Sequence, residues 1–190
     1  METPVIMQAS DIISSVSLIF VLIGGGFALY RYLKSAAIQR ASYVDSLVER
    51  LRQDAELREI FYIFEYNKPW YGSFFHGSDI PETWELERKV DKTLAFYSYI
   101  CYLLRKRMIE KAEFNFFAYQ IRRTLENWEV LDYLYNLYHF AACNGVKSTF
   151  NELIEYGKKN KYLPTDFFDK KACTCHIIFH HYLNFQLAES

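Results

Sequence analysis

The feature that most constrains this chain is a run of 19 residues without a charged side chain, from Ile12 to Tyr30. An α-helix rises about 1.5 Å per residue, so about 20 apolar residues cross a bilayer core of about 30 Å. A buried helix of a soluble protein seldom stays uncharged on every side over this length. The run therefore predicts a transmembrane helix over 12–32, after a short extracytoplasmic N-terminus over 1–11.

The charges on either side of this run predict its orientation. Arg31, Lys34 and Arg40 follow the run and no Lys or Arg precedes it, and positive residues stay on the cytoplasmic side of a membrane. Glu2 and Asp11 precede it, whereas a signal peptide has a positive start. We therefore expect a single-pass protein of the inner (cytoplasmic) membrane, with its N-terminus outside and the rest of the chain in the cytoplasm.

One face of the run carries small or polar residues at alternating spacings of three and four. This seam consists of Ser14, Ser17, Val21, Gly24, Ala28 and Arg31. Small residues let helix backbones approach closely in lipid, which predicts a homo-oligomer. Two interpretations remain open: an anchor that self-associates, or a small pore with the serine hydroxyls along its path and Arg31 near its inner mouth. The span alone favours the anchor, because such seams also serve ordinary dimers.

The residues that follow the span are expected to be helical. No proline lies between residues 5 and 68, so we expect the span to continue as one juxtamembrane helix over 33–66. A loop containing Pro69, Gly72, Gly77 and Pro81 then introduces a cytoplasmic helical domain over 67–190. The predicted fold class is all-α, with one N-terminal transmembrane helix followed by a cytoplasmic multi-helix bundle.

Apolar stripes divide this domain into helices. The spacing predicts helices over about 82–108 and 114–125, and another that includes 131–138 and ends at Asn144-Gly145. Thr149 and Glu152 form a capping-box pair that predicts a fifth helix, stopping near Gly157. Residues 166–188 are compatible with either helix or strand, because β-branched and aromatic side chains are frequent there.

The segment from Val90 to Phe140 resembles the helical core of a broad set of uncharacterised bacterial single-span membrane proteins with a cytoplasmic helical domain. The resemblance lies in VDKTL at residues 90–94, Ile109-Glu110, and FAYQIR at residues 117–122. The layout of the chain is also similar to that of membrane effectors in bacterial anti-phage defence systems. The resemblance implies no catalytic residues.

Composition and motifs argue against several other classes. A net charge of −1 excludes nucleic-acid binding driven by overall basicity, and 51% hydrophobic with 18% aromatic residues exclude disorder. No nucleophile elbow, phosphate-binding glycine loop or zinc-protease motif occurs, so we expect no enzyme and no cofactor. The glutamates at 126, 129, 152 and 155 are expected to lie on solvated helix faces.

Cys173, His176 and His180 share one face of a helix and could bind zinc. Their spacing matches no standard zinc site, and free cysteines are commonly buried. We therefore favour structural thiols and histidines, with no metal. A cytoplasmic location also predicts that the four cysteines of the chain are reduced.

Basic residues supply the remaining candidate site. They are Arg105, Arg107, Arg122 and Arg123. Arginine binds phosphate in a bidentate manner and nearby aromatic rings can stack a base, which would fit an anionic nucleotide-type ligand. The competing interpretation, which we favour, is that nearby glutamates pair with these arginines on the surface.

The sequence thus predicts a membrane-anchored homo-oligomeric effector whose partners are further copies of itself, the lipid bilayer, and an anionic ligand or a partner protein. In this hypothesis the helical domain gates a small pore or ion channel, within anti-phage defence. The alternative is a membrane-tethered protein-interaction module that conducts nothing.

Overall fold

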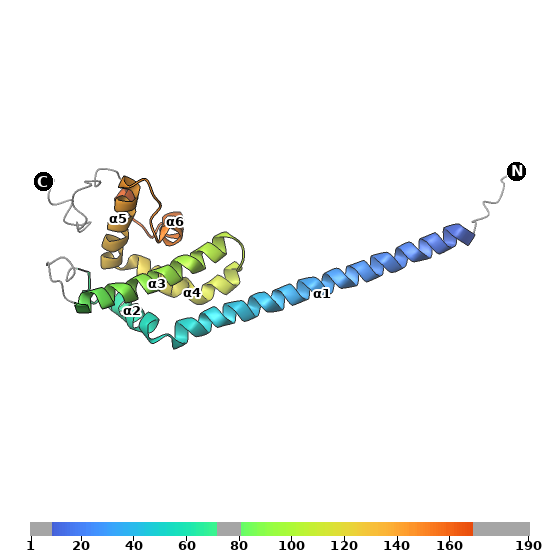
Figure 1. Ribbon diagram of the computed structural model, residues 1–190, viewed down its shortest axis with the longest axis horizontal. Coiled ribbons are helices and arrows are strands. Elements are labelled where there is room, and N and C mark those ends of the chain that lie inside the picture. The colour runs from blue at the N-terminus through green and yellow to red at the C-terminus, as the bar shows by residue number, and fades with distance from the viewer. Residues whose placement is uncertain (1–8, 72–80, 169–190) are drawn as a thin grey trace. The chain divides into compact units, whose positions relative to one another are not determined.

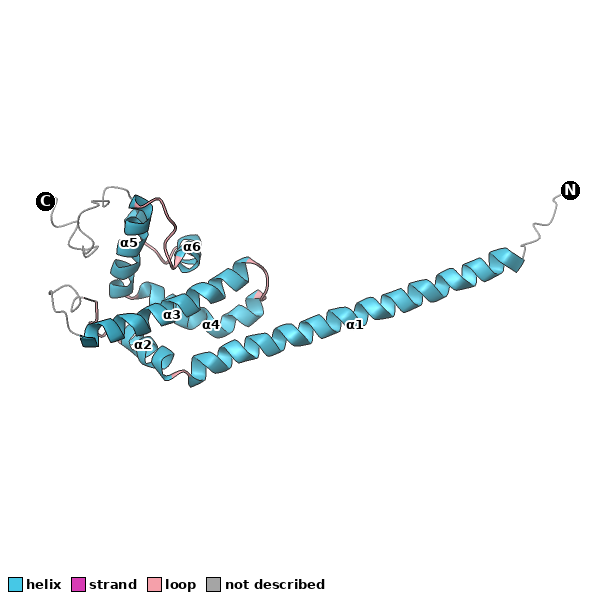
Figure 2. Ribbon diagram, viewed as in Figure 1, coloured by secondary structure: helices cyan, strands magenta, loops and turns pink. Residues whose placement is uncertain are grey.

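The computed structural model describes residues 9–71 and 81–168, and every regular element in these residues is helical (Figures 1 and 2). The predicted all-α class is confirmed for this part of the chain. The α-helices are α1 Ala9–Gln53, α2 Ala55–Glu65, α3 Pro81–Arg105, α4 Lys111–Glu126, α5 Trp128–Cys143 and α6 Asn151–Lys159. A short 3-10 helix, η2, follows at Thr165–Phe168.

The chain divides into two compact units, Met1–Asp45 and Ser46–Ser190. The described part of the first unit is a single stretch of α1. Its side chains from residue 16 to 39 are exposed, and its most apolar window of 18 residues has a mean hydropathy of 1.7. Among the described residues, α1 is the one helix that is long and apolar enough to cross a membrane. This confirms the predicted candidate span by length and composition.

The helix that carries the span ends at Gln53, so the expectation of one uninterrupted helix through residue 66 is wrong. Asp54 is the N-cap of α2, and its Oδ1 accepts hydrogen bonds from the backbone N–H groups of Glu56 (3.1 Å) and Leu57 (3.3 Å). An aspartate N-cap satisfies donors that would otherwise lack partners at the start of a helix. Burial alone would raise the pKa of Asp54, but hydrogen bonds from Lys92 and from the backbone lower it.

Helix α3 is the centre of the second unit, because α2, α4 and α6 all pack against it. Its predicted stripe of Val90, Leu94, Tyr97 and Cys101 is buried. Met108, which was expected to continue that stripe, lies beyond the end of the helix and is 53% exposed. Burial of this stripe against its neighbouring helices forms one part of the core of the domain, which also includes Trp70, Phe150 and Phe167.

Charged side chains connect α2 and α3 along their exposed edge. The acids belong to α2 and its N-cap, and the bases belong to α3. The pairs are Asp54–Lys92 (2.7 Å), Glu56–Arg88 (2.6 Å) and Glu59–Lys89 (2.9 Å). Exposed ion pairs of this kind stabilise a fold only weakly, by about 0–1 kcal/mol each.

The later helix boundaries agree with the sequence in part. Helix α5 ends at Asn144-Gly145 as predicted, and Gly145 takes the left-handed conformation (φ 68°) that favours glycine. The predicted capping box of Thr149 and Glu152 does not form, because Phe150 is the N-cap of α6 and makes no side-chain cap bond. Helix α6 also continues through Gly157 to Lys159. Apart from η2, the segment predicted as helix or strand at 166–188 lies outside the described residues.

Candidate functional site

The predicted seam lies on α1 within the first unit. The side chains of Ser14, Ser17, Val21, Ala28 and Arg31 are exposed in the single chain. A Cβ atom built on Gly24, Gly25 or Gly26 would meet nothing within 4 Å. Every described position of the seam is therefore sterically open to another helix.

Arg105 stands at the end of α3 and is held by α6. Its Nε and a terminal nitrogen donate to the two carboxylate oxygens of Glu152, at 2.5 and 2.8 Å. Its guanidinium also lies 5.6 Å from the centre of the Tyr102 ring. Arg107 is exposed in the following turn and has a left-handed backbone (φ 57°). The bidentate pair with Glu152 occupies the groups that would otherwise bind a phosphate.

Arg122 and Arg123 lie near the other end of α4. Arg122 Nε donates to Glu126 at 2.7 Å. Arg123 donates to the carboxylate and to the backbone carbonyl of Glu65, both at 3.1 Å. Glu65 also accepts from the Tyr119 hydroxyl at 2.6 Å, and these two partners lower its pKa. Arg123 and Tyr119 thus fasten α4 to the end of α2, whereas the Arg122 pair lies within α4.

The structure does not bring the four predicted arginines into one site. Arg122 lies eleven residues beyond Lys111, which is about 16 Å along the axis of α4. Arg105 precedes α4 and faces a different partner helix, α6. Three of the four are paired with glutamates, so the arrangement resembles a set of surface ion pairs.

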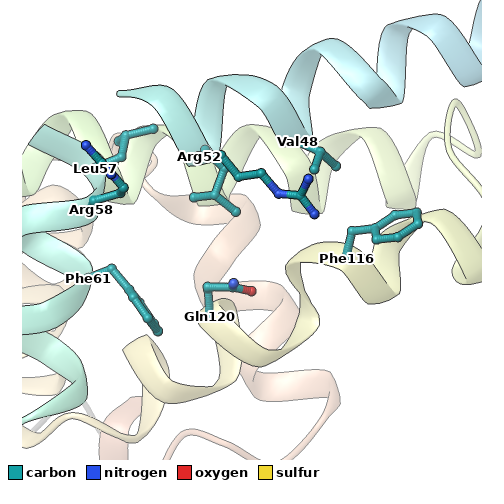
Figure 3. A pocket seen from close by; sticks show the side chains of 8 residues that line it. Val48, Arg52, Leu57, Arg58, Phe61, Phe116 and Gln120 are labelled. Atoms are coloured by element: carbon teal, nitrogen blue, oxygen red, sulfur yellow. The ribbon is translucent and has the colours of Figure 1, made fainter. Parts of the chain in front are cut away.

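A cavity of about 260 Å³ lies elsewhere, among the end of α1, α2 and α4 (Figure 3). Its apolar lining comes from Val48, Leu51 and Leu57, and two phenyl rings, those of Phe61 and Phe116, also border it. Its polar lining consists of Arg52, Arg58 and Gln120. All of these residues belong to the second unit.

Sequence reasoning missed this cavity because it depends on the break at Asp54. On one continuous helix, residues 52 and 58 are six positions apart and point about 120° away from each other. The break places Arg52 on the last turn of α1 and Arg58 on α2, with both side chains at one cavity. The available signal was Asp54 itself, an N-cap residue followed by an acidic first turn.

A second polar cluster lies at the start of α5 and is buried. Glu129 is 2% exposed, and its Oε2 accepts from the backbone N–H groups of Trp70 (2.5 Å) and Tyr71 (2.9 Å). The expectation that Glu129 is solvated is therefore wrong. Without this carboxylate, the buried N–H groups of Trp70 and Tyr71 would lose their acceptor, and buried backbone donors are normally paired.

Tyrosine hydroxyls extend this cluster toward α3. The Tyr133 hydroxyl donates to Asp91 at 2.6 Å and lies 3.3 Å from Glu87, and Asn136 donates to the Tyr71 hydroxyl at 2.9 Å. Burial raises the pKa of both Asp91 and Glu87, and the Asp91 charge raises that of Glu87 further. No three metal-ligating side chains converge in the described residues. The contacts join α3, α5 and the 67–71 segment, which is a structural role.

The cysteines do not all follow the sequence-based expectation. Cys101 is free, and burial raises the pKa of its thiol. Cys143 is disulfide-bonded in the structure, which contradicts the expectation of four reduced thiols. The candidate zinc ligands Cys173, His176 and His180 lie outside the described residues.

Comparison with known proteins adds no relative. No family model, no curated protein and no solved structure matches the chain.

Proposed function

We propose that this chain is a membrane-anchored effector that assembles through its span into a homo-oligomeric pore, controlled by its helical domain. The observation that carries the proposal is the continuity of α1. This helix runs from Ala9 to Gln53, so it contains the seam and also supplies the buried residues Leu47 and Leu51 of the second unit. A change in how the domain packs against the last turns of α1 would therefore act on the same helix that carries the seam.

The membrane placement in this proposal follows from charge. Arg31, Lys34 and Arg40 stay on the cytoplasmic side, so the second unit is cytoplasmic and the N-terminus is outside. The disulfide at Cys143 favours an oxidising compartment instead. We give the basic flank more weight, because three positive residues follow the span and none precedes it. The anti-phage context is proposed from the layout of the chain alone.

The test replaces a seam residue and compares it with a neighbour off the seam. Gly24→Leu adds bulk where helices must approach closely, and a Cβ atom at Gly24 meets no described side chain within 4 Å in the single chain. The matched control is Leu22→Ile, which keeps an apolar side chain off the seam. The readouts are oligomer size in detergent and membrane depolarisation on expression in bacteria.

The pore proposal expects wild type and Leu22→Ile to form the same oligomer and to depolarise cells. Gly24→Leu should insert normally but assemble poorly and leave the membrane potential intact. Equal behaviour of wild type and Gly24→Leu in both assays would contradict the pore.

The second candidate function is a tethered interaction module without conduction. Exposed aromatic side chains on the domain favour it: Tyr62 of α2 stacks on Tyr66, the C-cap of α2, at 6.1 Å between ring centres, and Tyr119 of α4 is 55% exposed. Aromatic side chains are enriched at the cores of protein interfaces. A wild-type protein that leaves the membrane potential unchanged, yet loses cellular function on Tyr62→Ala, would support this candidate.

A further inference from the structure

The cavity beside the break at Asp54 is the feature that the proposed function does not explain. Four arginines of the domain have carboxylate partners, namely Arg88, Arg105, Arg122 and Arg123. Arg52 and Arg58 have no ion pair with any described residue, although both line the same cavity. No described carboxylate lines it either. Two guanidinium groups at one cavity create a positive potential that favours an anion.

The remaining lining indicates what else the anion would carry. Phe61 and Phe116 come from two different helices, and Phe116 is 58% exposed although it is fully apolar. Figure 3 shows these rings on either side of Gln120, with Arg52 across from it. Aromatic rings at the edge of a site provide stacking surfaces for a planar group.

Gln120 adds a specific polar requirement. Its Oε1 is buried and accepts no hydrogen bond from the described residues. A buried acceptor without a donor costs about 1–3 kcal/mol, so a ligand N–H placed there would remove that cost. A ligand that matched all three features would be an anion with a planar ring that bears an N–H donor.

We infer that this cavity binds a mononucleotide. Its phosphate would be held by Arg52 and Arg58, its base would stack on Phe61 or Phe116, and an N–H group of the base would donate to Gln120. A volume of about 260 Å³ suits one base, with the phosphate at the mouth where both arginines are exposed. Arginine is suited to phosphate because its planar fork binds two oxygens at once.

Binding here would act on the end of the helix that carries the span. Arg52 lies on the last turn of α1, and Arg58 lies on the first turns of α2, on either side of the Asp54 cap. A phosphate held by both arginines would fix the angle between α1 and α2. This regulatory consequence rests on the proposed function, whereas the binding itself does not.

The experiment measures binding to the full-length protein in detergent by isothermal titration calorimetry. The probes are AMP, GMP, CMP and UMP, with adenosine and inorganic phosphate as partial ligands. We expect at least one mononucleotide to bind with a Kd below about 1 mM, and both partial ligands to bind at least about tenfold more weakly, because each makes only part of the contacts.

Variants assign the binding to the cavity. Arg52→Ala and Arg58→Ala should each weaken mononucleotide binding by about tenfold to a hundredfold. Arg52→Lys should restore only part of it, because lysine lacks the planar fork. Lys147→Ala removes one exposed charge outside the cavity and should change nothing. Both arginines are exposed and form no ion pair with a described residue, so the circular dichroism spectra of these variants should match wild type.

Three results would overturn the inference: no mononucleotide binding up to about 1 mM, phosphate binding as tightly as the nucleotide, or an equal loss in Lys147→Ala. The depolarisation assay separates this outcome from that of the proposed function. If wild type binds a nucleotide but does not depolarise cells, the binding site is supported and the pore is contradicted. If wild type depolarises cells but binds no nucleotide, only the binding site is contradicted.

Discussion

Replacing Glu129 is the sharpest test of how the domain is held together. Its buried carboxylate accepts the backbone N–H groups of Trp70 and Tyr71 and so attaches the 67–71 segment to the first turn of α5. The attached segment is also packed, because the Trp70 ring lies 5.9 Å from that of Phe64 and 5.6 Å from that of Tyr133. Glu129→Ala removes the acceptor and leaves a space beside two buried donors.

The expected loss follows from these two bonds. Hydrogen bonds to a charged group contribute about 1.5–3 kcal/mol each, so Glu129→Ala should lower the free energy of unfolding by about 3–5 kcal/mol. For a unit of this size, 1 kcal/mol moves Tm by about 2–4 °C, so the midpoint should fall by roughly 6–20 °C. Glu129→Gln keeps an acceptor oxygen but loses the charge near the helix N-terminus. Its free energy of unfolding should therefore fall by only about 1–2 kcal/mol.

The assay is thermal unfolding of the full-length protein in detergent, followed by circular dichroism and tryptophan fluorescence. Glu155→Ala on the exposed face of α6 is the control and should leave Tm unchanged. A Glu129→Ala midpoint equal to that of wild type would refute the reasoning. A larger fall in Tm for Glu129→Gln than for Glu129→Ala would refute it as well, because the Gln variant keeps an acceptor for the two backbone N–H groups.

Three further predictions follow from packing, titration and topology. Gly157→Ala should lower stability by about 1–2 kcal/mol, although Ala normally favours a helix, because its Cβ would lie 2.9 Å from Leu163 Cγ; a higher Tm would contradict this. Burial raises the pKa of Asp91, so its folded form holds a proton more tightly than the unfolded chain, and stability falls as pH rises from about 4 toward the folded pKa. Asp91→Asn should therefore flatten that fall and raise Tm at neutral pH, and an unchanged pH profile would exclude this role. A reporter fused after Ser190 should be active in the cytoplasm, because the basic residues follow the span; periplasmic activity of the fusion would reverse the orientation.

The sequence predicted the features that depend on local periodicity. The stripe of Val90, Leu94 and Tyr97 marks the buried face of α3 because apolar residues spaced by three and four lie on one side of a helix. The end of α5 was also predictable, since Gly145 occupies a left-handed position that glycine adopts without a steric penalty. Both features need only a few consecutive residues.

The features that sequence reasoning missed depend on contacts between distant segments. Asp54 is compatible with a helix interior as well as with an N-cap, and its bond to Lys92 is visible only after α2 and α3 have packed. Glu129 looks like a surface residue until the backbone of Trp70 is placed against it. The cavity at Arg52 requires both the break at Asp54 and the approach of α4, so no spacing of residues along the chain reports it.

The charges between α2 and α3 determine more than stability. Because Asp54 pairs with Lys92 and Glu59 pairs with Lys89, the order of the partners runs in opposite directions along the two helices. A slip of one helical turn, about 5.4 Å, would leave the pair at one end without its opposite charge. The pairs therefore specify the alignment of α2 against α3, because a shifted alignment leaves the charge at one end without its partner. Identical copies carry the same order of charges, so these pairs would align α2 on α3 equally well if neighbouring copies in an oligomer exchanged this helix.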